Sequence, residues 1–352
     1  MQVKTAKAAI LEQSRTPLVV DEIEFPASLD VGQVLVKVLY TSICGAQINE
    51  IAAAKGPDRF LPHLLGHEAS AEAIEIGPGV TTVAPGDTVV LHWRPSWGIQ
   101  SNTPSYRWRG AKLNAGWVTT FNEHAVVSEN RMTVIPPGYD LKAAVLLGCA
   151  VTTAAGVINN DAKLKIGESV AVFGVGGVGL NIVQFARLAG AHPIVAVDLL
   201  DHKLDMATRF GATHVVNSSR HDDVSAEIRR IVGDGGPDKV IETTGVKSVI
   251  ELAYELTHAD GTCVLVGVPS EKVTIYTLPL HFRKVLTGSH GGSAVPQTDI
   301  PRLVRLNQEG RISFDGIITH EFALDDINVA LDLVCSGAAG RVLLNVLGSK
   351  AA

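Results

Sequence analysis

The sequence predicts an α/β protein in which a β-rich segment precedes a doubly wound parallel sheet. Three observations indicate this fold class. The chain has 352 residues, which is too long for one ordinary core and suits two domains. Short β-branched runs separated by turn residues fill residues 1 to about 150. From about residue 168, buried strands alternate with helical patterns, as they do around a parallel sheet.

The strands expected in the first segment are short runs bounded by glycine and proline. They are "GQVLVKVLY", "ASAEAIEIGPG", "VAPGDTVVLHW", "FNEHAVVSEN" and "RMTVIPPG". In the second segment, "SVAVFG" and "PIVAVD" indicate buried strands around a helix, "GVGLNIVQFARLAG", and a further helix is expected to end at Gly211. The tail, residues 292–352, predicts two helices and a closing strand, "RVLLNVLG".

Composition and charge exclude several classes of function. The net charge of −6 gives no bulk electrostatic basis for binding nucleic acid. No run reaches the roughly 18 apolar residues of a membrane span, and the N-terminus has no apolar signal core. We therefore expect a cytoplasmic protein with no membrane or nucleic-acid partner. Four widely spaced cysteines argue against a disulfide framework.

A glycine loop predicts a dinucleotide site. "FGVGGVG" places Gly174, Gly176 and Gly179 as G-x-G-x-x-G between a strand and a helix. The helix N-terminus then offers free N–H groups to the pyrophosphate. Asp198 ends the next strand, where a carboxylate binds a ribose 2′-hydroxyl and repels a 2′-phosphate, so NAD is favoured over NADP.

Two cysteines and a histidine form a candidate metal set. Cys44 leaves a strand at a bend that contains glycine, His67 stands beside Glu68, and Cys149 lies where the two segments meet. Two sulfur ligands and one nitrogen ligand leave a tetrahedral position open, which is typical of a catalytic zinc. Spacing alone leaves ordinary buried residues as the alternative for each.

The ordered motifs resemble those of the zinc-dependent alcohol dehydrogenases of the medium-chain dehydrogenase/reductase family. The run "ICG…LLGHEASAEAIEIGPGVTTVAPGDTVV…GC…FGVGGVG…VD" matches the family's order and spacing over nearly the whole chain. The resemblance implies a GroES-like catalytic domain over residues 1–150, a Rossmann NAD-binding domain over 151–291, and a return to the first domain over 292–352. It also implies a homodimer or homotetramer.

The resemblance implies roles for individual residues. Cys44, His67 and Cys149 would hold zinc, with Glu68 as a carboxylate able to exchange with water at the metal. Thr153 and Val178 would border the nicotinamide beside Val266 and Val268, Asp198 and Lys203 would hold the adenosine ribose, and Arg341 would reach the pyrophosphate. Gly177 belongs to the same cofactor loop. The residues implied for the substrate side are Gln47, Asn49, His92 and Trp93.

The chain departs from the family pattern in two places. The lobe at about residues 92–116 has no cysteine, so we expect one catalytic zinc per chain and no structural zinc. After Cys44, the usual hydroxyl, aspartate and histidine are replaced by Ala46, Gln47 and Asn49, which cannot relay a proton. We therefore hypothesise a water-mediated route that ends at His92.

All four tryptophans, Trp93, Trp97, Trp108 and Trp117, lie close together among arginines and lysine. One interpretation is a lobe packed on its own rings; another is a pocket wall for a polyol, sugar or sugar derivative, which we favour. Tyr106 and Asn114 could bind hydroxyls or be structural. The predicted function is an NAD- and zinc-dependent dehydrogenase. The alternatives are a zinc-free quinone or enoyl-type reductase of the same fold and a non-catalytic nucleotide-binding protein.

Overall fold

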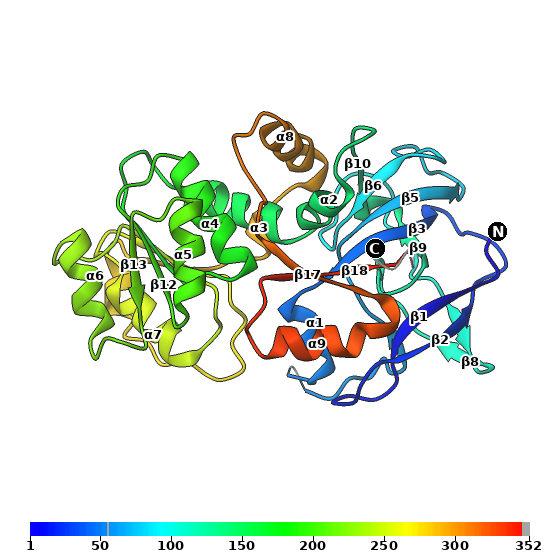
Figure 1. The fold of residues 1–352 in the computed structure, drawn as a ribbon, viewed down its shortest axis with the longest axis horizontal. Helices are drawn as coiled ribbons and strands as arrows, with labels where there is room; N and C mark the ends of the chain where they lie inside the picture. The colour runs from blue at the N-terminus through cyan, green and yellow to red at the C-terminus, as the bar shows by residue number, and fades with distance from the viewer. Residues whose placement is uncertain (55, 347–352) are drawn as a thin grey trace. The chain divides into compact units, whose positions relative to one another are not determined.

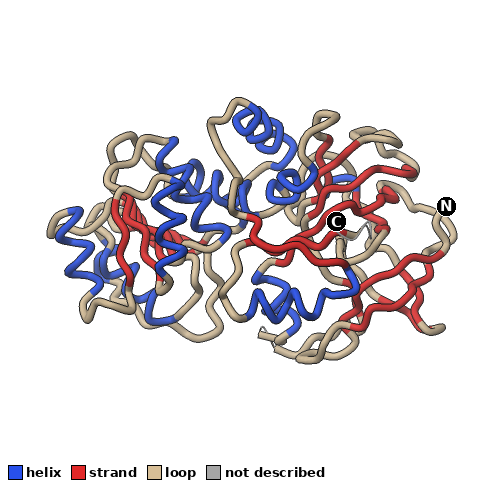
Figure 2. The backbone as a smooth tube through the Cα atoms, viewed as in Figure 1, coloured by secondary structure: helices blue, strands red, loops and turns tan. Residues whose placement is uncertain are grey.

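A computed structural model of the chain describes residues 1–54 and 56–346 (Figure 1). The chain divides into two compact units. Unit 1 comprises Met1–Cys149 and the chain from Val295 onward, and unit 2 comprises Ala150–Ala294. Figure 2 shows that strands dominate unit 1, whereas in unit 2 helices flank a single sheet.

Unit 1 contains two sheets among its described residues. The first has the order β4-β1-β2-β7-β8, formed by His63–Leu64, Thr5–Leu11, Val19–Glu24, Tyr106–Trp108 and Ala111–Leu113. The second has the order β10-β6-β5-β3-β18-β17, with β9 also paired to β3; its strands are Met132–Val134, Thr88–Leu91, Ala69–Ile76, Gln33–Ile43, Arg341–Asn345, Ile318–Ala323 and, for β9, His124–Ser128. Apolar side chains of the second sheet form a buried core that includes Val36, Ala71 and Leu344.

The described chain after Val295 belongs to unit 1. Strand β18 pairs antiparallel with β3, so that Leu343 lies opposite Ser42. Two helices belong to this segment, α8 (Pro296–Gln308) and α9 (Ile327–Cys335), and α9 packs against α1 (Gly45–Ile51). Helix α2 (Leu141–Leu147) packs on β3 and β5. Two 3-10 turns, η1 (Glu129–Arg131) and η5 (Leu324–Asp326), complete the unit's regular elements.

Unit 2 is a parallel sheet with the order β13-β12-β11-β14-β15-β16. Its strands are His214–Asn217, Ile194–Asp198, Val170–Phe173, Lys239–Glu242, Thr262–Leu265 and Val285–Gly288. Strand β11 is buried along its whole length, as expected when helices cover both faces of a parallel sheet. The strand order reverses between β11 and β14, where doubly wound sheets bind ligands.

The helices of unit 2 follow the predicted alternation with strands. They are α3 (Ala150–Gly156), α4 (Gly177–Leu188), α5 (Asp201–Phe210), α6 (Val224–Val232) and α7 (Lys247–Leu256), with short turns η2 (Val157–Asp161), η3 (Leu278–His281) and η4 (Gly291–Ser293). Helix α5 ends at Gly211, which has the left-handed φ of +113°. The α/β fold class is confirmed.

No single helix among the described residues is long and apolar enough to cross a membrane, although the bent pair Leu141–Leu147 and Ala150–Asp161 meets that length and composition when taken together.

Candidate active site

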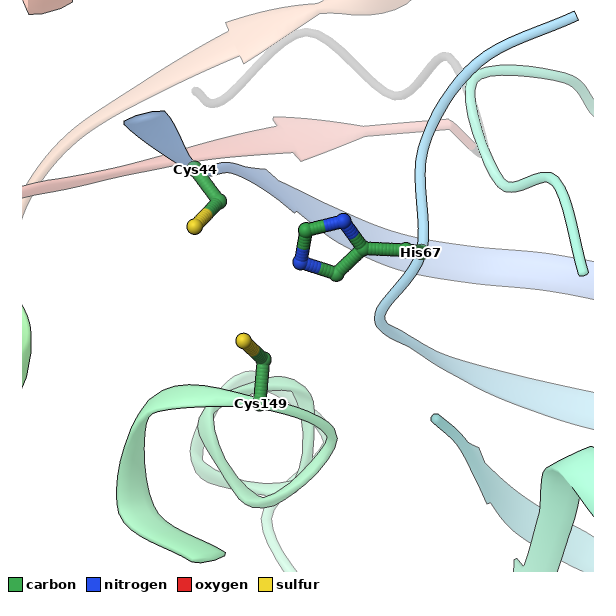
Figure 3. Close-up of side chains that lie close together, drawn as sticks. All are labelled: Cys44, His67 and Cys149. Atoms are coloured by element: carbon green, nitrogen blue, oxygen red, sulfur yellow. The ribbon is translucent and has the colours of Figure 1, made fainter. Parts of the chain in front are cut away.

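Three side chains from separate connections of unit 1 come together as a ligand set. Cys44 follows β3 and precedes α1, His67 lies between β4 and β5, and Cys149 follows α2. One ligand atom of each lies within 4.8 Å of the others. Figure 3 shows the two sulfur atoms and the imidazole ring facing a common space. The structure thus brings together the three residues that the sequence singled out.

The donor atoms fit a zinc ion. Two sulfurs and one imidazole nitrogen are ligands that zinc prefers, and three protein ligands leave its fourth position open. His67 Nε2 is buried and has no hydrogen-bond partner among the residues that the structure describes. Buried polar atoms normally form hydrogen bonds. A buried ring nitrogen without one is suited to bind a metal ion.

The two thiols shift each other's pKa in opposite directions. The neighbouring Cys149 thiol, with help from His67, holds the pKa of Cys44 well below its ordinary value. The neighbouring Cys44 sulfur and burial raise the pKa of Cys149. A metal ion binds the thiolate form of cysteine and releases the thiol proton. A lowered pKa at Cys44 therefore favours metal binding.

Gln47 connects two of the ligands. Its side chain is 1% exposed, its Oε1 accepts a hydrogen bond from the Cys44 backbone N–H at 2.9 Å, and its Nε2 contacts His67 Nδ1. The Gln47 amide therefore lies against Nδ1, while Nε2 is the ring nitrogen with no hydrogen bond among the described residues. Such contacts fix the orientation of a metal-binding histidine.

The position of His67 depends on the preceding glycine. Gly66 has a φ of +89°, and a Cβ at this position would lie 2.3 Å from Thr120 Oγ1. Any other residue would therefore clash and be strained at once. The "GH" pair in the sequence places the imidazole where the chain turns from β4 into β5.

Glu68 takes part in a buried ion pair beneath the ligands. Its Oε1 accepts hydrogen bonds from Ser42 Oγ at 2.5 Å and from Arg341 Nη1 at 3.0 Å. Burial raises the pKa of Glu68, an effect that Arg341 partly offsets. Arg341 lies here because β18 begins beside the end of β3. Its Nη2 has no hydrogen-bond partner within residues 1–54 and 56–346, and its predicted contact with pyrophosphate stays a prediction.

The glycine loop of unit 2 has the geometry of a phosphate-binding turn. Gly174 has a φ of +83°, and a Cβ on Gly179 would lie 2.0 Å from Gly174 O. At Gly176, by contrast, a Cβ would have no neighbour within 4 Å among the described residues, so a ligand can approach the backbone there. The loop leads into α4, whose N-terminus provides free N–H groups. The loop therefore fits a dinucleotide.

Asp198 lies beside this loop at the end of β12. Its Oδ2 accepts a hydrogen bond from Val175 N at 2.9 Å, and its Oδ1 accepts one from Leu199 N at 2.8 Å. Oδ1 also accepts a hydrogen bond from Leu200 N at 3.2 Å, so these bonds fix the carboxylate while Oδ2 keeps a lone pair for a ribose hydroxyl. The other predicted cofactor residues lie in unit 2 at buried Thr153, partly buried Gly177, Val178, Lys203 and Val266, and exposed Val268.

A cavity of about 760 Å³ in unit 1 is lined by His67. Trp93, Trp117, Asn114 and Arg131 form other parts of its wall. This volume lies in the range of small-molecule sites. The cavity therefore borders the ligand set at His67.

Comparison with known proteins identifies the family. Residues 30–137 match the alcohol dehydrogenase GroES-like domain, and residues 177–309 match the zinc-binding dehydrogenase family. Alcohol dehydrogenase class-P of Arabidopsis thaliana is 32% identical over 378 aligned residues, which cover 98% of each chain. The chain belongs to the zinc-dependent alcohol dehydrogenases of the medium-chain dehydrogenase/reductase family.

Two further relatives of this alcohol dehydrogenase agree. The S-(hydroxymethyl)glutathione dehydrogenase of Paracoccus denitrificans is 31% identical, with 95% of this chain and 98% of the relative covered. A solved structure, an alcohol dehydrogenase zinc-binding domain protein from Burkholderia ambifaria, superimposes with a TM-score of 0.89 at 29% identity, covering 97% of this chain and 99% of the other. The GroES-like and Rossmann folds are thereby confirmed.

The structure corrects the hypothesis that His92 is the proton acceptor of this alcohol dehydrogenase. His92 is 1% exposed and does not line the cavity. Its Nδ1 bonds to Arg94 O at 2.8 Å and its Nε2 to Thr133 Oγ1 at 3.0 Å. Burial lowers the pKa of His92 to about 4, so the ring is neutral near pH 7. Packing, rather than acid–base chemistry, accounts for this residue.

The tryptophan lobe also needs correction, because its rings do not share one role. Trp93 and Trp117 line the cavity. Trp97 is 62% exposed, and Trp108 is buried with its Nε1 donating to Asp21. Tyr106 is structural, since it is fully buried and its hydroxyl accepts from Val126 N. Asn114 reaches the cavity and donates to Phe60 O.

Sequence reasoning missed two residues of the cavity wall. His63 Nε2 lies 2.8 Å from Asp58 Oδ2, and both residues line the cavity. The five-residue separation of Asp58 and His63 was the available signal. Arg131, between two predicted strands, was also overlooked. Asn49 lies in α1, outside the lining of the cavity.

Proposed function

We propose that this alcohol dehydrogenase uses one zinc ion and NAD(H) to interconvert a polyol, sugar or sugar derivative and the corresponding carbonyl compound. The observation that supports this most directly is the cavity, which joins the ligand residue His67 to the ring systems of Trp93 and Trp117. Apolar ring faces suit the carbon skeleton of a sugar, while Asn114 supplies a polar group on the same wall.

The residues divide the chemistry among them. Cys44, His67 and Cys149 would hold zinc, which supplies a Lewis acid for the substrate oxygen, while the nicotinamide supplies the hydride acceptor or donor. Gln47 holds Cys44 and His67 in their orientation. The closely spaced ligand set argues against a zinc-free reductase, and the family argues against a non-catalytic protein.

When the alcohol is oxidised, its hydroxyl proton must leave the active site. The family's usual hydroxyl is absent at Ala46, and the Gln47 amide cannot accept the proton as a base. We propose that water in the cavity carries it to an ionisable side chain on the wall. Asp58 and His63 provide such a group, with Asp58 Oδ2 and His63 Nε2 placed 2.8 Å apart.

A screen of NADH formation tests the proposed function. Sorbitol, xylitol and butane-2,3-diol are compared with ethanol and benzyl alcohol, each with NAD and with NADP. We expect the highest kcat/KM with a polyol and NAD. A preference for ethanol or benzyl alcohol would overturn the substrate class, and turnover of none of a broad panel would overturn the activity.

The first prediction concerns the cofactor. Asp198→Ser is expected to lower kcat/KM for NAD about tenfold and to narrow the preference over NADP, since it removes a charged acceptor for the ribose hydroxyl. Asp205→Ser, on an exposed position of α5, is the control. A wild-type enzyme with higher kcat/KM for NADP would show that the assignment of NAD is wrong.

The second prediction concerns the cavity wall. Trp93→Ala is expected to change the ratio of kcat/KM for sorbitol to that for ethanol about three- to tenfold, because one ring face is lost. Affinity for NAD should stay the same. Trp97→Ala is the matched control, since Trp97 lies in the same lobe and does not line the cavity. Equal substrate ratios in both variants would assign Trp93 a structural role.

A further inference from the structure

Arg131 is a buried cation on the wall of the substrate cavity. It ends the 3-10 turn η1 between β9 and β10 and is 5% exposed. It lines the same cavity as His67. A charged side chain removed from water normally has an opposite charge beside it.

The partners of Arg131 are neutral. Its Nη2 donates to the Gln100 amide oxygen at 3.2 Å, and its Nη1 is buried with no hydrogen-bond partner in the described part of the chain. The guanidinium lies 5.3 Å from the centre of the Trp117 ring, which Ser101 O fixes through the indole N–H. Among the described residues, no carboxylate forms an ion pair with Arg131.

The nearest carboxylate in sequence is used elsewhere. Glu129 Oε1 accepts hydrogen bonds from Thr81 N at 2.7 Å and Thr82 N at 2.9 Å, and its Oε2 accepts one from Ile99 N at 2.7 Å. Arg94 adds a second positive charge close to Arg131, and together with burial it lowers the pKa of Arg131. The charge of Arg131 is therefore left for a partner from outside the chain.

The cavity wall carries further positive charges in addition to Arg131, and it also carries carboxylates. Arg59 and Lys112 also line it, as do the carboxylates Asp58 and Glu50. Asp58 is already engaged by His63 and by the Phe60 backbone N–H. The planar guanidinium group can form two parallel hydrogen bonds to a carboxylate or a phosphate, so these anions are its preferred partners.

We propose that the substrate carries an oxyanion, a carboxylate or a phosphate, that binds Arg131 while its hydroxyl-bearing carbon lies toward His67. This inference rests on the proposed dehydrogenase function and narrows its substrate to an anionic polyol or sugar derivative. Trp117 lies against the guanidinium and completes the binding wall. The neutral Gln100 holds Arg131 in place without neutralising its charge.

Matched substrates test this inference. Sorbitol is compared with gluconate and with sorbitol 6-phosphate, which distinguish a carboxylate from a phosphate. We expect at least one anionic compound to exceed sorbitol about tenfold in kcat/KM. Arg131→Met is expected to lower kcat/KM for the preferred anionic compound about 10–100-fold, the effect of losing a charged hydrogen bond. The kcat/KM for sorbitol should change less than about threefold.

Arg107→Met is the control, because Arg107 is an exposed arginine of the same lobe outside the cavity lining. Arg131→Lys keeps the charge and should recover part of the preference, which also covers the case in which Arg131→Met fails to fold. The inference is overturned if wild type prefers sorbitol to both anions, or if Arg131→Met lowers all three values equally.

A binding measurement separates this inference from the proposed function. Trp93 and Trp117 line the cavity, so their fluorescence reports ligands without turnover. Saturable quenching by gluconate or sorbitol 6-phosphate, lost in Arg131→Met, supports the anion site even if no alcohol is oxidised. The anion site is contradicted if sorbitol quenches the wild-type fluorescence as strongly as the anions do, or if neither anion causes detectable quenching.

Discussion

Cys149→Ala is expected to bind less than about 0.1 zinc per chain, compared with one in the wild type, and to lose at least about 10³-fold in kcat. The sulfur atoms of Cys44 and Cys149 and the ring of His67 lie within 4.8 Å of one another, so removal of one leaves an incomplete set. Loss of a mere supporting contact costs 10–100-fold in metal affinity, and a lost ligand should cost more. Zinc contributes several kcal/mol to catalysis when bound.

Elemental analysis of the purified protein measures the metal independently of activity. Cys335→Ala is the matched control, because Cys335 is a free, exposed cysteine at the end of α9. We expect this control to keep one zinc and full activity. Two tightly bound zinc ions per wild-type chain, or unchanged zinc in Cys149→Ala, would show that the predicted site is wrong.

Arg341→Met is expected to destabilise unit 1 by about 3–5 kcal/mol, because it leaves the Glu68 carboxylate buried without its cation. The guanidinium and carboxylate are 3.0 Å apart, and both side chains are almost fully buried. Urea unfolding followed by tryptophan fluorescence measures this change. All four tryptophans lie in unit 1, so the signal reports the unit that contains the ion pair.

Two variants make this measurement specific. Arg107→Met removes an exposed arginine whose carboxylate partner is 4.0 Å away, and it should change the unfolding free energy by less than about 1 kcal/mol. Adding Glu68→Gln to Arg341→Met should recover part of the loss, since no buried charge remains. Equal destabilisation by Arg341→Met and Arg107→Met would contradict the prediction.

The same variant tests the predicted contact between Arg341 and the pyrophosphate. Arg341 Nη1 donates to Glu68, whereas Nη2 has no hydrogen-bond partner among the described residues. The prediction is that Nη2 donates to the cofactor pyrophosphate. In that case Arg341→Met should weaken NAD binding about tenfold, the effect of a lost charged hydrogen bond. Unchanged NAD affinity in the folded variant would confine Arg341 to its role beside Glu68.

The features that local sequence encodes were predicted correctly. The buried strand "SVAVFG" and helix "GVGLNIVQFARLAG" appear as β11 and α4, because apolar periodicity depends on which face of an element meets the core. Gly174 and Gly179 are required within one short loop, because Gly174 has a φ of +83° and a Cβ on Gly179 would lie 2.0 Å from Gly174 O. The order of such motifs along the chain sufficed to indicate the family.

The direction in which a side chain points was not predictable in the same way. His92 and Trp93 are adjacent, yet His92 is enclosed between Arg94 O and Thr133 Oγ1 while Trp93 lines the cavity. Likewise, the four tryptophans look equivalent in sequence, but only Trp93 and Trp117 line the cavity. His92 and Trp93 follow β6 in a connection without strand periodicity, so only packing decides which of the two side chains is enclosed.

The sequence by itself determined the fold class, the ligand types and the cofactor loop, because each follows from residue chemistry and local backbone geometry. Only the tertiary structure decided which charges meet. Arg341 bonds to Ile43 O, 298 residues away in sequence, and through that approach it reaches Glu68. The absence of a carboxylate beside Arg131 among the described residues is equally a result of long-range packing. Electrostatic interactions depend on separation in space and on burial, and neither quantity is a property of a local stretch of sequence.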